Sequence, residues 1–225
     1  MAKNKNIEFL SPCFRNLPKE EITGLYTHKT QITYLPHETI LKQGAFASHV
    51  LFVNSGLVRV FLQTGAQKHI NIRIARQGDF LAFSSLFNSN VYPYSAVALR
   101  ESNICMLNKD ALRDVFFKNP DFAQEITALN CRNEQRYLDI ITNISYKQMR
   151  GKLASVLLYL SSEEFEGDHV FESLSRAEIA DFATISVEST VKFLKEFEKE
   201  QIISLQGKDI TILNKSVLQE INQKG

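Results

Sequence analysis

Residues 175–200, SRAEIADFATISVESTVKFLKEFEKE, contain two short stretches of helical periodicity that are separated by only a Thr-Ile pair. Ser175 and Glu178 have the spacing of a capping box, which satisfies two backbone N–H groups at the start of the first helix. Ser186 is a residue type that favours the N-cap position of a second helix. Two helices joined by so short a turn cross at a steep angle, and the stretch therefore predicts a helix-turn-helix.

The second helix of this stretch is predicted to have two faces of different chemistry. Its inward positions are Val187, Thr190, Leu194 and Phe197, and its outward positions are Glu188, Ser189, Lys192, Lys195 and Lys199. A carboxylate can accept from the cytosine N4 amine, and an ammonium group can donate to guanine N7 and O6. We therefore expect Glu188 and Lys192 to read neighbouring base pairs, and the later lysines to contact phosphates. The open alternative is a solvated ion pair between Glu188 and Lys192 on an ordinary surface helix.

The sequence after these helices predicts a β-hairpin. IISLQGKDITIL contains two short runs of strand-forming residues around Gln-Gly-Lys, which is a turn sequence. A hairpin directly after a helix-turn-helix would form the wing of a winged helix.

A long helix is predicted upstream, after Asn119-Pro120, where the missing N–H of proline costs nothing. A narrow stripe at spacings of three and four consists of Ile126, Leu129, Asn133, Tyr137, Ile140 and Ile144. A stripe this narrow favours a coiled-coil seam between two copies of the chain, and Asn133 within it would fix a parallel, two-stranded register. The open alternative is that the stripe packs on the chain's own β-sandwich.

The region from about Ile32 to Leu107 has the pattern of short strands. HINIRI alternates strictly, and VLFVNSGLVRVFL contains two apolar runs around an Asn-Ser-Gly turn. Glycines punctuate these runs at short intervals, which is typical of an antiparallel sandwich or barrel. The fold class expected is α+β: an N-terminal antiparallel jelly roll, a long dimerisation helix and a C-terminal winged helix-turn-helix.

Composition limits the class of protein. The 225 residues are 44% hydrophobic and 23% charged, as in a globular protein of two domains. The sequence has no apolar run long enough to cross a membrane and no signal peptide, so we expect a cytoplasmic protein. The net charge of +1 requires any nucleic-acid contact to be a local patch. The cysteines Cys13, Cys105 and Cys131 are far apart, so we expect small buried hydrophobes rather than disulfides or a metal cluster.

Several stretches together resemble the CRP/FNR superfamily of bacterial transcription regulators. The resemblance runs from YLPHETILKQG to Leu213, and MRGKLASVLLYL and SVESTVKFL carry it most strongly. It implies a cyclic-nucleotide-binding-like sensor in residues 1–118, a dimerisation helix and hinge in 119–145, and a DNA-binding domain in 146–225. It also implies a homodimer on double-stranded DNA, with RNA polymerase as a further partner and no membrane. Two-fold symmetry then predicts an inverted-repeat operator.

The residues expected to contact DNA are Ser175, Arg176, Ser186, Val187, Glu188, Ser189, Val191, Lys192, Lys195 and Lys208. The family's Glu falls on Glu188 and its base-contacting Arg on Lys192, and lysine is less suited than arginine to bidentate contact with guanine. Val187 matches the FNR branch rather than the CRP branch. Val191 replaces an FNR-branch serine, and we expect both valines to touch thymine methyl groups.

The sensor sequence departs from the cyclic-nucleotide branch. Its cassette reads GDFLAFSSLFNSNVYPYSA, with Phe83 at the ribose-binding Glu and Tyr94 at the phosphate-binding Arg. Loss of the arginine removes the charge-assisted contact to a cyclic phosphate, so a cyclic-AMP site is not expected. The residues of a candidate effector pocket are Phe83, Ser84, Tyr94, Ser95 and Tyr137. The aromatic residues here could line a pocket for an apolar or planar ligand, but a filled core is the favoured interpretation.

The sequence also bears on other cofactors and activities. Only Cys13 lies where the FNR branch has a cysteine cluster, which argues against an iron–sulfur cluster, while haem remains an open candidate. An alternative function is therefore a regulatory module of the same fold that binds haem or another small molecule. The histidines are never two apart, and neither a phosphate loop nor a nucleophile elbow occurs, so an enzyme is not expected. A module that meets only proteins would leave DNA binding unaffected when Lys192 and Lys195 are replaced by alanine.

The resemblance also implies a mechanism of control. An effector on the jelly roll would shift the dimer seam and a hinge near Ile144 and Ser145, which changes the distance between the two DNA-reading helices. Such a shift requires different affinities of the effector for the two states.

Overall fold

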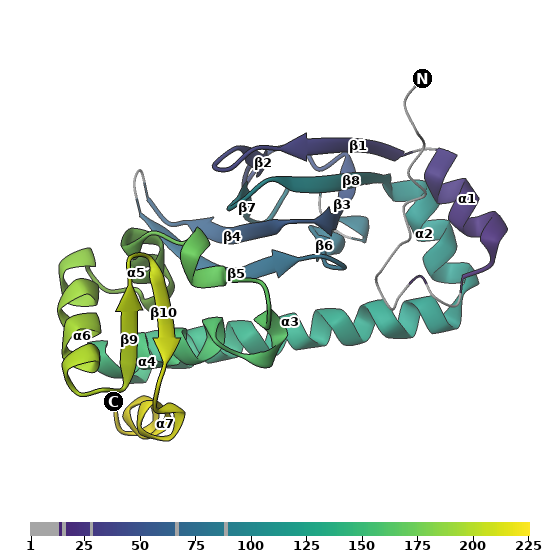
Figure 1. The fold of residues 1–225 in the computed structure, drawn as a ribbon. Coiled ribbons are helices and arrows are strands. Elements are labelled where there is room, and N and C mark those ends of the chain that lie inside the picture. The colour runs from purple at the N-terminus through teal and green to yellow at the C-terminus, as the bar shows by residue number, and fades with distance from the viewer. Residues whose placement is uncertain (1–13, 15–16, 28, 66–67, 88–89) are drawn as a thin grey trace. The chain divides into compact units, whose positions relative to one another are not determined.

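The computed structural model describes residue 14 and residues 17–27, 29–65, 68–87 and 90–225 (Figure 1). Cys13 and His28 lie outside these residues. The chain divides into two compact units. The sheet unit contains Met1–Leu62 and Arg73–Asn133, and the helical unit contains Gln63–Ile72 and Glu134–Gly225. One of the three boundaries between them, at Asn133 and Glu134, falls inside a long helix.

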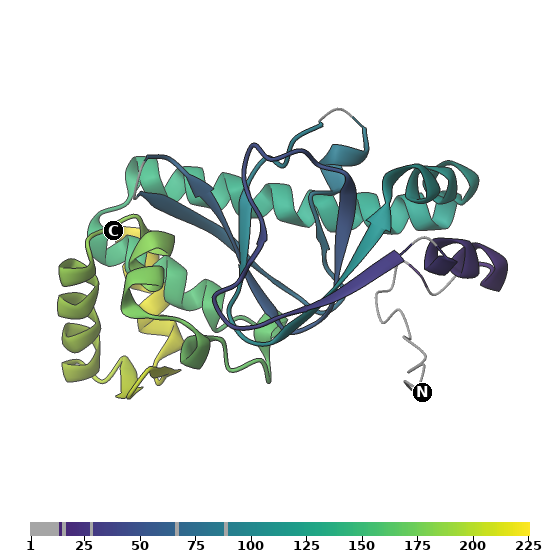
Figure 2. The same cartoon turned by 90° about the horizontal axis from the view of Figure 1, so that it is seen from above.

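The predicted strand region forms two four-stranded antiparallel sheets, visible side by side in Figures 1 and 2. The first has the order β1-β8-β3-β6, formed by Lys29–Tyr34, Ser102–Asn108, His49–Ser55 and Phe80–Leu81. The second has the order β2-β7-β4-β5, formed by Thr39–Leu41, Ser95–Ala98, Leu57–Gln63 and His69–Arg76. The prediction of an antiparallel β-structure in this region is confirmed.

Gly56 makes the tight connection between β3 and β4. Its φ of 103° is a conformation that favours glycine, and a Cβ atom there would lie 2.6 Å from the Cα of Ser102. No other residue type fits this position.

The core of the sheet unit is largely aromatic. Phe14 packs against Phe52, Phe80 and Phe122, with ring centroids 5.3, 5.6 and 5.6 Å away. Aromatic pairs at these separations contribute beyond their buried area. The core therefore includes the first turn of the long helix, which carries Phe122.

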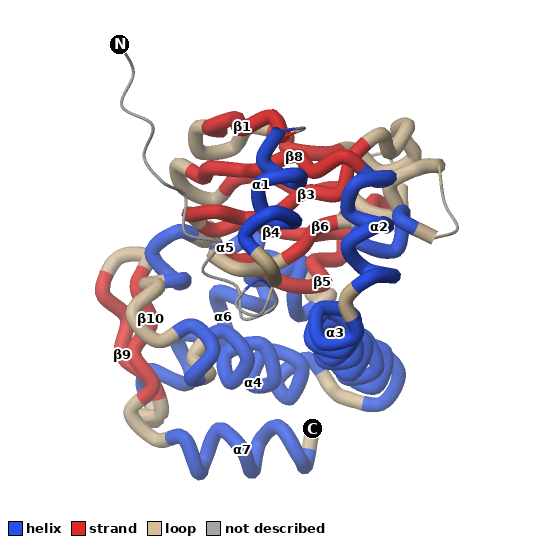
Figure 3. Tube along the Cα trace, turned by 90° about the vertical axis from the view of Figure 1, so that its right-hand side faces the viewer, coloured by secondary structure: helices blue, strands red, loops and turns tan. Residues whose placement is uncertain are grey.

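Two helices of the sheet unit, α1 (Lys19–Thr27) and α2 (Lys109–Lys118), lie at one end of its strands in Figure 1, and Figure 3 looks onto that end. The side chain of Asn108 caps α2 by accepting from the backbone N–H groups of Asp110 and Ala111. A 3₁₀ turn, η2 (Phe83–Leu86), follows β6, and the long helix α3 runs from Pro120 to Tyr146. The predicted helix after Asn119-Pro120 is confirmed.

The prediction that this apolar stripe of α3 forms a dimer seam is wrong at two positions. Ile126 is fully buried in the aromatic core of the sheet unit, and Leu129 packs against that core. At these two positions the stripe packs on the chain's own sandwich, which was the alternative. Asn133 and Tyr137 are half-buried, Ile140 is buried, and Ile144 is exposed. The exposed apolar residues of α3 include Leu138, Ile141 and Ile144, and of these three only Ile144 belongs to the predicted stripe.

The helical unit contains the predicted winged helix. Its elements are α4 (Met149–Leu160), η3 (Glu163–Phe165), η4 (Val170–Ser173), α5 (Arg176–Ala183), α6 (Val187–Lys199), β9 (Ile203–Gln206), β10 (Asp209–Ile212) and α7 (Lys215–Lys224). The core of this unit includes Leu153, Leu157, Ile179, Leu194 and Phe197, each at most 1% exposed. Within the described part of the chain, no helix has both the length and the apolar character needed to cross a membrane.

Candidate nucleic-acid interface

The helix-turn-helix forms as the sequence predicts. The Ser175 hydroxyl accepts from the Glu178 N–H at 3.2 Å, and the Glu178 carboxylate accepts from the Ser175 N–H at 2.8 Å. These two bonds make the capping box that starts α5. Thr184 takes a left-handed conformation, with φ of 52°, and ends the helix. Thus Ser175, predicted to contact DNA, fixes the start of the motif.

The start of α6 is held by two serines. The Ser186 hydroxyl accepts from the Ser189 N–H at 3.1 Å, which is the predicted N-cap. The hydroxyl oxygens of Ser186 and Ser189 lie 3.1 Å apart. Ser186 is exposed and Ser189 is half-buried, so both belong to the outer end of the helix as well as to its cap.

The inner face of α6 is as predicted at three of four positions. Thr190, Leu194 and Phe197 are at most 1% exposed. Val187 was predicted to point inward, but it is 41% exposed because it occupies the first turn, ahead of the packed part of the helix. Its exposure agrees with its other predicted role, a contact with DNA. Val191 is half-buried on the flank of the helix.

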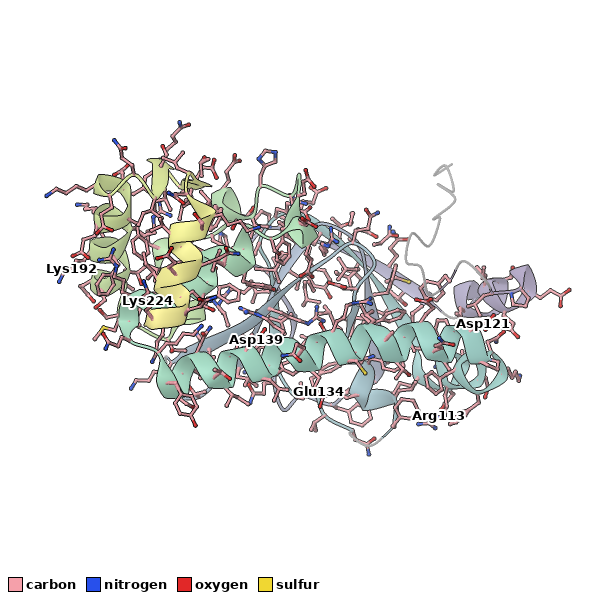
Figure 4. All side chains as sticks on the ribbon, turned by 90° about the horizontal axis from the view of Figure 1, so that it is seen from below. Arg113, Asp121, Glu134, Asp139, Lys192 and Lys224 are labelled. Carbon is pink, nitrogen blue, oxygen red and sulfur yellow. The ribbon has the colours of Figure 1, made fainter. Side chains whose placement is uncertain are left out.

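The outer face of α6 carries the predicted charges. Glu188, Lys192 and Lys195 are all exposed, and the Lys192 side chain is 68% exposed (Figure 4). The Nζ atom of Lys192 lies 3.9 Å from Oε1 of Glu196, one turn further along. It also lies 5.6 Å from the centroid of the Phe193 ring. The alternative to base reading was a surface ion pair between Lys192 and Glu188. Lys192 does form a surface ion pair, but its partner is Glu196.

Glu188 is held as a carboxylate at the N-terminus of α6. Hydrogen bonds from its own backbone N–H and from the Ser186 hydroxyl lower the pKa of Glu188 below its ordinary value. An ionised carboxylate only accepts hydrogen bonds, which is the chemistry needed to meet an exocyclic amine of a base.

The wing is a two-stranded hairpin with a two-residue turn. Asp209 pairs with Gln206, so Gly207 and Lys208 are the central residues. Gly207 has a φ of 62°, as the first central residue of a type II′ turn requires. Lys208 is exposed at the tip.

Arg176 was predicted to contact DNA, and the structure shows its guanidinium bonded to this wing. Its Nη2 and Nη1 groups donate to the carbonyl oxygens of Gly207 and Lys208, at 2.9 and 3.1 Å. Burial lowers the pKa of Arg176, and the nearby Asp209 carboxylate opposes that shift.

An anchor that the sequence did not reveal joins α4 to α6. Nη2 of Arg150 lies 2.5 Å from Oε2 of Glu200, and Nη1 lies 3.9 Å from Oε2 of Glu196. The guanidinium carbon stands 5.0 Å from the centroid of the Phe197 ring. These partners are about fifty residues from Arg150 in sequence, and no local pattern signals such a pairing.

The candidate effector pocket is largely filled. Phe83 belongs to the core and its ring lies 5.9 Å from that of Phe80 and 5.8 Å from that of Phe87. The Tyr94 hydroxyl accepts from the Ala82 N–H at 2.6 Å, and the Ser95 hydroxyl accepts from the Gln43 N–H at 3.0 Å. Ser84 is exposed. At Phe83 the structure therefore shows the filled core that was the favoured interpretation, and Tyr137 lies in the other unit.

The cysteine prediction is half right. Cys105 is buried, as expected, but Cys131 is exposed on α3. Among the residues that the structure describes, no cluster of three His, Cys, Asp or Glu side chains is placed to hold a metal ion.

The end of α3 is fastened to the rest of the helical unit. The Arg136 guanidinium stacks 3.5 Å above the Tyr159 ring centroid, and the Asn143 side-chain amide donates to the Ser155 hydroxyl at 2.7 Å. Lys147 also bonds to Asn222 of α7 at 2.5 Å. Burial lowers the pKa of Arg136 despite the nearby Tyr159 and Asp139. The helix continues through Ile144 and Ser145, so the residues of the predicted hinge are helical.

Two family models match the chain. One describes a cyclic nucleotide-binding domain and matches residues 31–119, and the other describes a Crp-like helix-turn-helix domain and matches residues 151–221. The fumarate and nitrate reduction regulatory protein of Yersinia pestis is 26% identical over 190 residues, covering 82% of this chain and 75% of that protein. The anaerobic regulatory protein of Aggregatibacter actinomycetemcomitans is 25% identical over 191 residues, covering 82% and 73%.

Solved structures show the same fold. FixK2 from Bradyrhizobium japonicum superposes with a TM-score of 0.74 at 18% identity, covering 86% of this chain and 97% of that one. The c-di-GMP responsive global regulator CLP from Xanthomonas campestris superposes with a TM-score of 0.70 at 19% identity, covering 87% and 99%.

A nucleotide-binding-type β-roll, a long helix and a Crp-like helix-turn-helix together define a DNA-binding transcription regulator rather than an enzyme. The two family models together match most of the chain, which belongs to the CRP/FNR superfamily of transcription regulators.

Proposed function

We propose that this protein is a homodimeric, sequence-specific transcription regulator that binds an inverted-repeat operator. The observation that carries the proposal is the outer face of α6, where Glu188, Lys192 and Lys195 are exposed beside an ordered N-cap. In a helix-turn-helix the N-terminal part of the second helix enters the major groove. The chemistry of α6 matches that location, because acceptor and donor side chains follow one another along it.

The direct reading of bases would fall to Glu188 and Lys192. The Glu188 carboxylate can accept from a cytosine N4 amine, and Lys192 can donate to a guanine one step away. Val187 and Val191 would touch thymine methyl groups, and Lys195 would meet a phosphate. Lys208, exposed on the wing, would meet a phosphate beside the groove.

The dimer would form through an exposed face of α3. Cys131, Leu138 and Ile141 are exposed, with Leu138 52% and Ile141 59% exposed. Their spacings of seven and three match the a and d positions of a coiled coil. Ile144, 39% exposed, flanks them and is retained from the predicted seam. A second copy of the chain would bury this stripe and present two α6 helices to one operator.

The sensor would respond to something other than cyclic AMP. Phe83 fills the position of the ribose contact, and Tyr94 uses its hydroxyl on the backbone of Ala82. Neither side chain supplies the positive charge that a cyclic phosphate needs. Family membership supports RNA polymerase as a partner, and a role at promoters implies a cytoplasmic location.

Selection of binding sites from random duplex DNA tests the proposal. The purified full-length protein is used without added ligand, at one stated salt concentration. We expect enrichment of a palindrome whose half-sites lie about one helical turn apart. A folded, dimeric protein that enriches no sequence, alone or with cell extract or haem added, would contradict it.

A further inference from the structure

Arg176 joins the first turn of α5 to the tip of the wing. Its guanidinium donates to both central carbonyl groups of the turn, those of Gly207 and Lys208. The two acceptors are consecutive, so the planar fork of an arginine fits them and a lysine ammonium does not. The side chain is half-buried against the hairpin, although α5 and the turn are about thirty residues apart in sequence.

The wing needs such a contact because it is small. Each of its strands has four residues, and an isolated two-stranded hairpin is marginally stable in water. Ile210 is buried and anchors the body of the hairpin, while Gln206, Gly207 and Lys208 are all exposed. The bonds from Arg176 therefore hold the part of the wing that the core does not cover.

We propose that Arg176 is a positioning residue for the wing: it fixes the Gly207–Lys208 turn against α5, and so sets where the Lys208 ammonium meets DNA. The second half of this inference rests on the proposed function. It assigns Arg176 a role different from the direct DNA contact expected from the sequence. Because the Arg176 guanidinium is bonded to two carbonyl groups, it affects DNA binding by holding Lys208 in position and does not itself contact a phosphate.

The first test needs no DNA. Amide hydrogen exchange is measured across the hairpin of the full-length protein, in wild type and in the R176A, R176K and K208A variants. We expect exchange at Gln206 and Asp209, the strand pair that closes the turn, to become on the order of tenfold faster in R176A and R176K, since opening of the turn loses its restraint. K208A keeps the carbonyl groups and should exchange like wild type. Unchanged exchange in R176A overturns the proposal.

A control variant distinguishes the contact of Arg176 with the turn from a general effect of removing a positive charge. R132A removes one exposed arginine from the part of α3 that belongs to the sheet unit, and should leave exchange in the hairpin unchanged. Equal acceleration in R132A and R176A would show a general loss of stability and would also overturn the proposal.

The second test is a double-mutant cycle on the selected operator. Dissociation constants are measured over a range of salt for R176A, K208A and the double variant. If Arg176 acts through Lys208, the double variant binds within about twofold of K208A, because effects that share one route are not additive. R176K should bind like R176A. Additive losses, together with near-normal binding by R176K, would make Arg176 a phosphate contact and contradict the proposal.

The two tests keep the inference distinct from the proposed function. A wild-type protein that selects no operator would remove the function, and the exchange measurement would still decide whether Arg176 holds the turn.

Discussion

At the scale of single residues, Glu196 links the outer face of α6, where we propose that bases are read, to the body of the helical unit. It lies between Lys192 and Arg150, at 3.9 Å from each. Pairs as exposed as these contribute little to stability, so their effect is on where the Lys192 ammonium points. Lys192 alone offers one point charge, and an arginine would offer a fork.

Replacement of Lys192 by alanine should relax sequence preference at a single base pair of each half-site. The loss should be about 1–3 kcal/mol at that position and near zero at the others. Competition binding with single-base variants of the selected operator measures it. Equal weakening on every sequence would instead make Lys192 a phosphate contact.

The ionisation of Glu188 should depend on Ser186. Because the folded pKa of Glu188 is lowered, its hydrogen bonds stabilise the start of α6 above the unfolded pKa. That contribution is lost as the pH falls through the folded pKa. Replacement of Ser186 by alanine should raise the pKa of Glu188, as followed by NMR titration of the carboxyl carbon. Ser189→Ala, which keeps the Ser186 hydroxyl, is the control, and an unchanged pKa in S186A would argue against the bond.

At the scale of elements, α3, α4 and α5 are joined by one aromatic side chain. Tyr159 receives the Arg136 guanidinium on its face and packs against Phe165 and Phe182, with centroids 5.2 and 6.1 Å away. A buried cation on a ring is stronger than an exposed one, because little water competes for it. The last turns of α3 are thereby part of the helical unit.

Replacement of Tyr159 by leucine should lower the free energy of unfolding of the helical unit by about 2 kcal/mol, from loss of the cation–π contact and the ring pairs. Tyr159→Phe keeps the ring and should cost clearly less. Chemical denaturation followed by circular dichroism measures both. Equal costs for the two variants would show that the ring face is not what matters.

Sequence patterns predicted elements better than they predicted partners. The capping box of Ser175 and Glu178 and the N-cap of Ser186 are local, so they located the helix-turn-helix correctly. On α3, however, two apolar stripes run along one helix, and periodicity alone does not say which one the sheets cover. Arg150 with Glu200, and Arg176 with Gly207, are contacts between distant residues that only the folded chain reveals. Helix α7 was not predicted at all.

At the scale of the whole molecule, the two faces of α3 should respond differently to substitution. L138E and I141E place charges on the uncovered stripe and should convert a dimer to a folded monomer in sedimentation experiments. I126A should instead destabilise the sheet unit by about 2–5 kcal/mol without dissociating the dimer, because Ile126 is buried in its core. Dissociation of the dimer by I126A, but not by L138E or I141E, would instead support the seam predicted from the sequence.

Cys131 offers a native probe of the same arrangement. It is exposed on the proposed seam, whereas Cys105 is buried. In a parallel dimer, two Cys131 side chains would face each other across the two-fold axis. A short bismaleimide should therefore crosslink the wild-type protein but not C131S.

The division of the chain at Asn133 and Glu134, inside an unbroken α3, bears on how sensors and DNA-binding parts can be exchanged between relatives. A chimera joined after Tyr146 would take Arg136 and Asn143 from one parent and Tyr159 and Ser155 from the other. The contacts between these residues would then depend on the helix sequence of the other parent. A junction in the middle of the helix, at residue 133, would keep Arg136 and Asn143 with their partners, and only Asn71, which donates to the Glu178 carbonyl at 2.8 Å, would come from the other parent. A suitable recombination point for this fold therefore lies inside its longest helix, where no break in the backbone marks it.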